Sequence, residues 1–177
     1  DNRHFWRVSN AEHLAMSEDC GIVNLSHFAI IDVEGPDHEA LMEWVCAAKI
    51  GGEANVGKGI YTHFLDDHGM VRADLTLIRM ADRCRVIDGA DAGPRDQIYV
   101  QRMAEDMGFN VTVTDRSSDL VTLGLWGPNA RATLKKVVAD PAGLDPENFP
   151  FAALRDIEIA GKTVTEYEPL LDFSHRP

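Results

Sequence analysis

Residues 60–79 read Ile-Tyr-Thr-His-Phe-Leu-Asp-Asp-His-Gly-Met-Val-Arg-Ala-Asp-Leu-Thr-Leu-Ile-Arg, and this stretch decides the fold. Two runs, 60–65 and 70–79, flank residues 66–69, whose composition is typical of a turn with a glycine available for positive φ. The side chains of the second run alternate between two faces, as a period of two requires: Val71, Ala73, Leu75 and Leu77 on one, Arg72, Asp74 and Thr76 on the other. The pattern predicts an antiparallel hairpin with one apolar and one polar face.

Asp74 stands out within this hairpin, because aspartate is depleted inside strands, where it competes with the hydrogen bonds of the ladder. The simpler interpretation is a solvent-facing residue paired with Arg72 or Thr76, since polar faces of antiparallel strands are common. The residue types alone therefore leave Asp74 open between a functional carboxylate and an ordinary polar position.

Elements on both sides of the hairpin predict an α+β fold with a largely antiparallel sheet and flanking helices. Strands are expected at 27–33, 83–88, 109–114 and 119–125, with a hairpin at 154–166 that turns at Ala160-Gly161. Helices are expected from about residue 10 to Cys20 behind a Ser9–Glu12 capping box, after Pro36, over Arg95–Met107, and after Pro128. The helix after Pro36 is predicted to bury Ala40, Leu41, Trp44, Val45 and Ala48.

Composition and charge exclude several classes of function. The chain has 177 residues and a net charge of −12, which opposes binding to nucleic acid or to an anionic membrane, because both need a basic face. No apolar run approaches the roughly 20 residues that span a bilayer. The first residues, 1–6, do not form a signal peptide. Three widely spaced cysteines, Cys20, Cys46 and Cys84, favour a reducing, cytoplasmic setting over a disulfide framework.

Three short motifs invite functional readings that the context does not favour. Gly52–Lys58 resembles a phosphate loop, but Gly59 replaces the required Ser or Thr, and the segment follows a helix instead of a strand. The best metal candidate is the group His63, Asp66, Asp67 and His68, although a solvated polar turn accounts for it more simply, and we assign no metal. Ser26-His27 lies in no Gly-x-Ser-x-Gly elbow, so nucleophilic hydrolysis is unsupported.

Several stretches, taken together and in order, resemble the glycine-cleavage T-protein family. They are 21–28 (GIVNLSHF), 33–37 (VEGPD), 59–62 (GIYT), 69–76 (GMVRADLT), 115–118, 125–131 (LWGPNAR) and 149–151 (FPF). The order and spacing hold over about 150 residues, which makes chance similarity a poor explanation. The Leu-Trp-Gly-Pro form at 125–128 is most similar to the folate domains of dimethylglycine and sarcosine dehydrogenases.

The resemblance implies that an aminomethyl or methyl group passes to or from tetrahydrofolate. Asp74 matches the family's catalytic carboxylate, which can orient an amine, stabilise a cationic one-carbon stage and help to move a proton. Tyr61 matches an aromatic position beside the folate, and Leu65 and Ile87 match apolar positions that flank the pterin, although strand packing would also account for these three. The implied partners are a small amine or methyl donor, and a flavin dehydrogenase domain or a lipoyl carrier protein.

The resemblance covers about the first half of a family member. After Thr165 the family continues with a segment whose glutamate holds the pterin, whereas residues 166–177 diverge from it. We therefore expect a partial folate-binding domain over 1–165 and a divergent tail over 166–177. Two alternatives stay open: a non-catalytic folate-binding or assembly module with the same fold, and an inactive fragment whose exposed apolar surface makes it a homo-oligomer.

Overall fold

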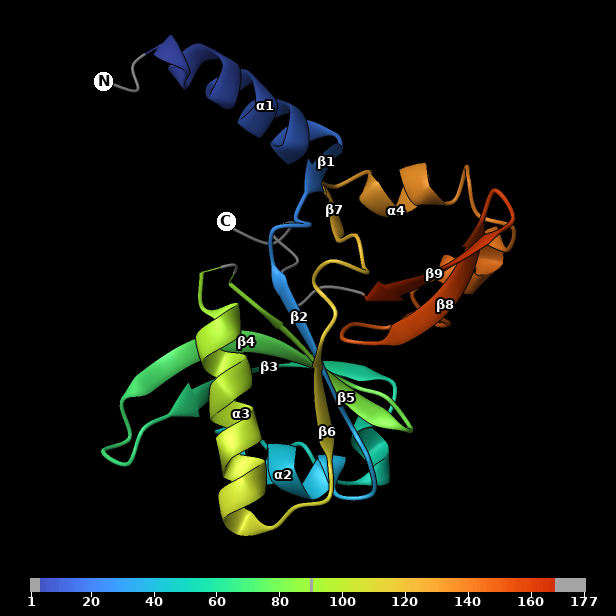
Figure 1. Ribbon diagram of the computed structural model, residues 1–177. Helices are drawn as coiled ribbons and strands as arrows, with labels where there is room; N and C mark the ends of the chain where they lie inside the picture. The colour runs from blue at the N-terminus through green and yellow to red at the C-terminus, as the bar shows by residue number, and fades with distance from the viewer. Residues whose placement is uncertain (1–3, 90, 168–177) are drawn as a thin grey trace.

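The computed structural model describes residues 4–89 and 91–167 and is built around a five-stranded antiparallel sheet (Figure 1). The strand order is β3 (Lys58–Leu65), β4 (Val71–Arg79), β5 (Arg83–Asp88), β2 (Ala29–Glu34) and β6 (Thr112–Asp115). Helices α2 (His38–Val45) and α3 (Gly93–Met107) pack on one face of this sheet. The predicted α+β class, with an antiparallel sheet and flanking helices, is confirmed.

The remaining elements lie beyond one end of the sheet (Figure 1). They are α1 (Trp6–Glu18), β1 (Gly21–Asn24), β7 (Leu123–Trp126), α4 (Ala130–Leu134), β8 (Leu154–Ile159) and β9 (Lys162–Tyr167), with a short 3-10 turn at Pro141–Leu144. Another short 3-10 turn, Glu53–Asn55, lies between α2 and β3 in the chain. Strand β1 pairs with β7, and β8 pairs with β9 as the predicted hairpin. A small second core gathers around this hairpin: Val138, Leu144, Phe149 and Ile157. No helix in the described part of the chain is long and apolar enough to cross a membrane.

The main core lies between the sheet and the two helices, and it follows from the period of the strands. Ala73, Leu75 and Leu77 of β4 are all buried there, as the alternation of the hairpin predicts. Adjacent strands add Val33 and Val86 to the same face. Each large aliphatic side chain buried in this way stabilises the fold by roughly 1.5–3 kcal/mol.

Two helix predictions were wrong in detail. Helix α2 begins at His38, so Pro36 precedes its first turn instead of lying in it, and the helix has only 8 residues. One stripe of it faces the sheet: His38, Leu41, Met42 and Val45. Trp44, predicted to be buried, is 62% exposed, because it lies outside this stripe; Ala40 is exposed for the same reason. Helix α1 begins at Trp6, with Ser9 inside it, so the expected capping box does not form. No residue of α1 is buried, so burial does not fix where this helix begins.

The expected tail falls largely outside the described residues. Strand β9 continues through Tyr167, so the boundary expected at 165/166 falls inside a paired strand. Residues 168–177 are not among the described residues. The division of the chain at this point stays a prediction.

Candidate functional site

The predicted site lies where the β3–β4 hairpin leaves the five-stranded sheet (Figure 1). Strand β4 pairs with β5 only from Thr76 to Arg79, whereas its pairing with β3 continues to Val71. The part of the hairpin without a third strand, residues 62–75, is called the arm below. Asp74 lies near the base of the arm, two residue pairs beyond the last position held by β5.

The register of the hairpin brings Asp74 next to two aromatic side chains. His63 pairs with Asp74 and Tyr61 pairs with Thr76, so all four side chains share the sheet face opposite the helices. The Tyr61 hydroxyl donates a hydrogen bond to Asp74 Oδ2 at 3.2 Å. The rings of Tyr61 and His63 meet edge to face, with centroids 5.2 Å apart. A carboxylate, a phenol and an imidazole therefore form one cluster.

The electrostatics of this cluster keep the Tyr61 phenol protonated. The hydrogen bond to Asp74, together with the negative charge of that carboxylate, raises the pKa of Tyr61. Tyr61 is 51% exposed and Asp74 is also exposed, so solvent reaches both groups. Asp74 Oδ1 has no hydrogen-bond partner within residues 4–89 and 91–167. The arrangement can accept a hydrogen bond from an incoming N–H group and stabilise a nearby positive charge.

Of the two predicted apolar site residues, one lies close to this cluster. Ile87 is the register partner of Thr76 on β5, so it is half-buried on the same face beside the base of the arm. Leu65 has the same strand parity as Tyr61 and His63, but it lies toward the tip of the arm. The structure therefore brings Tyr61, Asp74 and Ile87 together and places Leu65 further out.

The interpretation that Asp74 pairs with Arg72 was wrong, because a β-bulge in the arm displaces Arg72. Phe64 pairs with Ala73, but the next residue, Leu65, pairs with Val71, so Arg72 is the extra residue on β4. The bulge interrupts the alternation: Val71, predicted to be buried, is 63% exposed. The Arg72 guanidinium lies over the ring of Tyr99 on α3, 4.5 Å from its centroid, and does not pair with Asp74.

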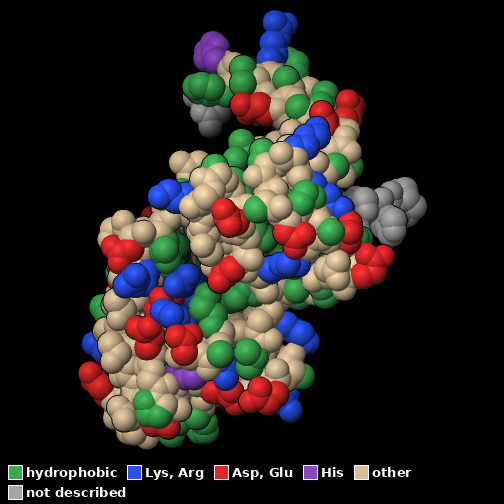
Figure 2. Space-filling view, turned by 90° about the vertical axis from the view of Figure 1, so that its right-hand side faces the viewer, with side chains coloured by type: hydrophobic (Ala, Val, Ile, Leu, Met, Phe, Trp, Pro, Cys, Tyr) green, Lys and Arg blue, Asp and Glu red, His purple; other side chains and the backbone are tan. Residues whose placement is uncertain are grey.

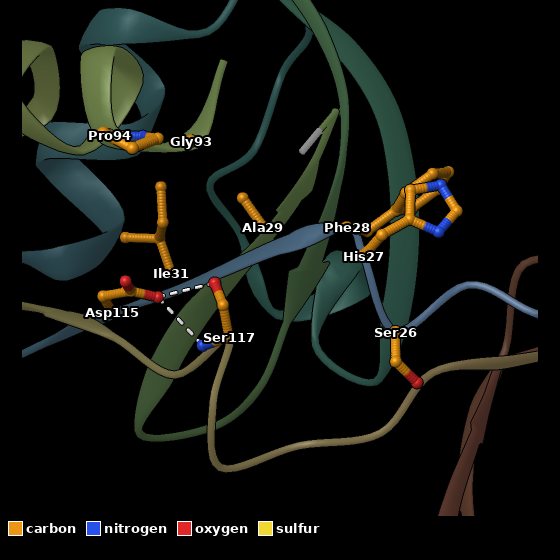
Figure 3. A pocket seen from close by; sticks show the side chains of 9 residues that line it. All are labelled: Ser26, His27, Phe28, Ala29, Ile31, Gly93, Pro94, Asp115 and Ser117. Carbon is orange, nitrogen blue, oxygen red and sulfur yellow. Dashed lines mark hydrogen bonds between the residues drawn. The ribbon is translucent and has the colours of Figure 1, made fainter. Parts of the chain in front are cut away.

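A cavity of about 180 Å³ lies away from this cluster, at the start of β2 and of α3 (Figure 3). Ser117 Oγ donates to Asp115 Oδ1 at 2.6 Å and accepts from the Ile30 amide at 2.9 Å. Ser26 Oγ bonds to the backbone of Thr122, and Figure 3 shows no pairing between Ser26 and the neighbouring His27. The side chains of Ser26, Asp115 and Ser117 are thus already hydrogen-bonded, which leaves few polar groups here to recognise a ligand.

A second cavity, of about 350 Å³, lies between β5 and the β8–β9 hairpin and is lined in part by Arg83 and Arg85. Arg85 forms two hydrogen bonds, of 2.7 and 2.8 Å, with the buried carboxylate of Asp32. Arg83 binds Glu34 at 2.9 Å and Asp82 at 3.0 Å. Acidic and basic side chains are interspersed on this side of the molecule (Figure 2). Both guanidinium groups are thus already neutralised, which disfavours an anion here.

The glycine-rich loop at 52–58 cannot cradle a phosphate, because carboxylates of α2 occupy its entrance. Glu43 Oε2 accepts from the amides of Ile50 and Gly51, at 2.6 and 2.7 Å. Glu39 Oε1 accepts from the amide of Gly52 at 3.3 Å. A hydrogen bond from Arg79 is the main reason why the pKa of Glu39 is lowered, so this carboxylate stays ionised.

The Asp66–Gly69 turn uses its polar groups to close the hairpin. Asp66 Oδ1 accepts from the amides of His68 and Met70, both at 2.9 Å. Gly69 has φ +76°, as predicted for a glycine in this turn. Within the described residues, no group of three or more His, Cys, Asp or Glu side chains is placed to hold a metal ion.

Sequence reasoning missed His63 as a neighbour of Asp74 and missed two buried acids, Asp88 and Asp96. A regular hairpin closed by residues 66–69 would have placed Tyr61 opposite Asp74, and only the register shift near the turn puts His63 there. The burial of Asp88 and Asp96, at 4% and 0% exposed, likewise has no signal in the sequence, since it depends on where α3 begins relative to β5.

Comparisons with known proteins support the family resemblance. A family model described as the GCVT N-terminal domain matches residues 2–166. An aminomethyltransferase of Bordetella avium is 33% identical over 86% of the chain and 42% of its own length. One from Bordetella pertussis is 34% identical over 68% of the chain and 33% of its own length. The chain thus spans well under half the length of these relatives.

Two solved structures share the fold. The glycine cleavage system aminomethyltransferase T of Bartonella henselae has a TM-score of 0.66 at 27% identity, over 81% of this chain and 37% of that chain. A chain of the heterotetrameric sarcosine oxidase from Corynebacterium sp. U-96 has a TM-score of 0.63 at 15% identity, over 93% of this chain and 79% of that chain. The second likeness concerns the fold alone.

Proposed function

Because the chain belongs to the GCVT N-terminal domain family, we propose that it is part of an enzyme of tetrahydrofolate-dependent aminomethyl or methyl transfer. One observation carries the proposal: Asp74, the residue that matches the family's carboxylate, is exposed and is oriented by Tyr61. An ionised acid with an unpaired oxygen, set beside an aromatic ring, is suited to a heterocycle that carries N–H groups.

Tetrahydrofolate would supply the nitrogen that carries the one-carbon unit, and the residues of the chain would bind and orient it. Asp74 Oδ1 accepts an N–H hydrogen bond, and its negative charge stabilises positive charge that develops on the reacting amine. Tyr61 occupies Oδ2 and so directs Oδ1 toward the ligand. Ile87, and at longer range Leu65, provide apolar contact for the pterin.

A more specific proposal concerns the donor of the one-carbon unit and the partner domain or protein. The Leu-Trp-Gly-Pro segment at 125–128 favours a methylated amine as donor and a flavin dehydrogenase domain as partner, by its similarity to dimethylglycine and sarcosine dehydrogenases. A lipoyl carrier protein is the corresponding partner in a glycine-cleavage enzyme. Two assays, run side by side, distinguish these donors: oxidation of dimethylglycine with a flavin as electron acceptor, and transfer of the methylene unit of a lipoyl-bound aminomethyl group to tetrahydrofolate with release of ammonia and without oxidation.

Asp74→Asn in the intact enzyme tests the proposal. We expect transfer to tetrahydrofolate to fall by about 100-fold or more, because the substitution removes the charge that stabilises the reacting amine. Asp67→Asn is a matched control, since Asp67 is an exposed acid in the turn of the same hairpin. Unchanged turnover in Asp74→Asn would overturn the assignment.

The open setting of Asp74 favours one alternative, a folate-binding or assembly module without catalysis. Isothermal titration with tetrahydrofolate, combined with the transfer assay, separates the two: binding without transfer in the intact protein supports the module. For an inactive fragment, light scattering would show oligomers that a folate does not dissociate.

A further inference from the structure

Helix α3 holds strand β4 only two residues away from Asp74. The Arg72 guanidinium lies over the Tyr99 ring of α3, and Arg95 of α3 donates to the Arg72 carbonyl at 3.0 Å. The bulge makes this possible, because it turns Arg72 out of the alternation and toward the helix. A two-stranded hairpin is marginally stable alone, so such external contacts decide how well the arm is fixed.

Both arginines converge on a single buried carboxylate. Arg95 donates to Asp96 through Nε at 2.9 Å and through Nη2 at 2.8 Å. Arg72 Nε lies 3.9 Å from Asp96 Oδ1. Asp96 is fully buried in the first turn of α3, where the partial positive charge of the helix also favours an anion. Asp96 is therefore the common anchor of the two groups that hold β4.

A second buried acid lies behind this anchor. Asp88, at the end of β5, accepts from the Gly89 amide at 2.7 Å through Oδ1, while its buried Oδ2 has no hydrogen-bond partner within the described residues. Burial and the neighbouring Asp96 raise the pKa of Asp88 to about 6, against the weaker opposing effects of the Gly89 amide and of Arg95. In its acid form, Asp88 can donate Oδ2–H to the Asp96 carboxylate.

We propose that Asp96 is a positioning residue for Asp74: through Arg95 and Arg72 it fixes the start of β4 against α3, and Asp88 supports it from behind. On the other strand of the arm, the Ala47 amide donates to the His63 carbonyl, so β3 has its own anchor. The α3 contacts supply the corresponding anchor for β4. The importance of Asp74 rests on the proposed function, but the anchoring of the arm does not.

Amide hydrogen exchange of the full chain tests the anchoring directly. Arg95→Met removes the bond to the Arg72 carbonyl, and the Arg95 side chain is 52% exposed, so the fold should persist. We expect exchange at residues 71–75 to accelerate by about tenfold, with β2 and β5 unchanged, because the arm opens locally. Arg102→Met is the control, since Arg102 is exposed on the same helix and has no hydrogen bond or ion pair within the described residues.

Asp96→Asn should accelerate exchange in the arm more strongly, because both arginines lose their shared carboxylate. Arg95→Met still tests the proposal if Asp96→Asn fails to fold. In the intact enzyme, Arg95→Met should lower kcat about tenfold and leave KM for the amine donor within about twofold, as expected for a misplaced but accessible Asp74. Unchanged exchange at 71–75 in Arg95→Met overturns the proposal. An inactive parent enzyme would instead overturn the proposed function and leave the exchange result standing.

Discussion

The two faces of the central sheet are built from the same strands but have different roles. On the helix-covered face, Leu75, Leu77 and Val86 are at most 2% exposed and belong to the main hydrophobic core. On the open face, the same strands present charged and polar groups that pair with one another, such as Arg85 with Asp32 and Tyr61 with Asp74. The comparison teaches that the first face supplies stability and that the second is available for chemistry.

The open face is not uniformly reactive. Near β5 its charges are mutually neutralised, because Asp32 and Glu34 bind the guanidinium groups of Arg85 and Arg83. At the base of the arm, Asp74 keeps an oxygen without a partner among the described residues and is open to solvent. The difference between these two regions singles out Asp74 more sharply than its position in a strand does.

Truncation of a side chain on each face should give the largest contrast in stability. Leu77→Ala removes a fully buried side chain from the helix-covered face and should lower the free energy of unfolding by about 2–5 kcal/mol. Ile87→Ala, on the half-buried open face, should cost less than about 1.5 kcal/mol. Urea denaturation measures the free energy of unfolding of both variants, and equal losses would contradict the different roles of the two faces.

Asp88→Asn should raise the free energy of unfolding, in contrast to Leu77→Ala, by a smaller amount that depends on pH. The pKa of Asp88 is about 6 in the folded chain and about 4 when unfolded, so the wild-type chain loses stability as the pH rises from 4 to 6. The amide cannot ionise, so between pH 4 and pH 8 the variant should gain about 1–3 kcal/mol relative to the wild type. Urea denaturation at the two pH values measures this gain. Asp67→Asn should show no such gain, and parallel pH profiles of Asp88→Asn and wild type would refute the expectation.

Tyr61→Phe should have the smallest effect on stability but a measurable effect on activity. The lost hydrogen bond is exposed, so the free energy of unfolding should change by less than about 0.5 kcal/mol. Transfer should fall by roughly 3–10-fold, because Asp74 loses the group that orients it. Steady-state kinetics of the intact enzyme measures this, and full activity would show that Tyr61 does not act through its hydroxyl.

Much of the fold could be predicted from local pattern. The alternation of Ala73, Leu75 and Leu77 predicted which face of β4 is buried, and Gly108 ends α3 in a left-handed conformation, where the helix was predicted to end. Sequence patterns gave wrong predictions where contacts with other elements of the fold decide the environment of a side chain. Trp44 has helical spacing but lies outside the narrow stripe that reaches the sheet, and Arg72 leaves the alternation at a bulge.

By itself the sequence determined the β3–β4 hairpin, most of its buried face, the family and the presence of Asp74 in that hairpin, because these depend on residue type and short-range spacing. Tertiary structure alone decided that Tyr61 binds Asp74, that Arg72 turns to α3, and that Asp88 and Asp96 meet in the interior. The physical reason is that such contacts join residues far apart in the chain, and their geometry exists only once the sheet and α3 have packed together.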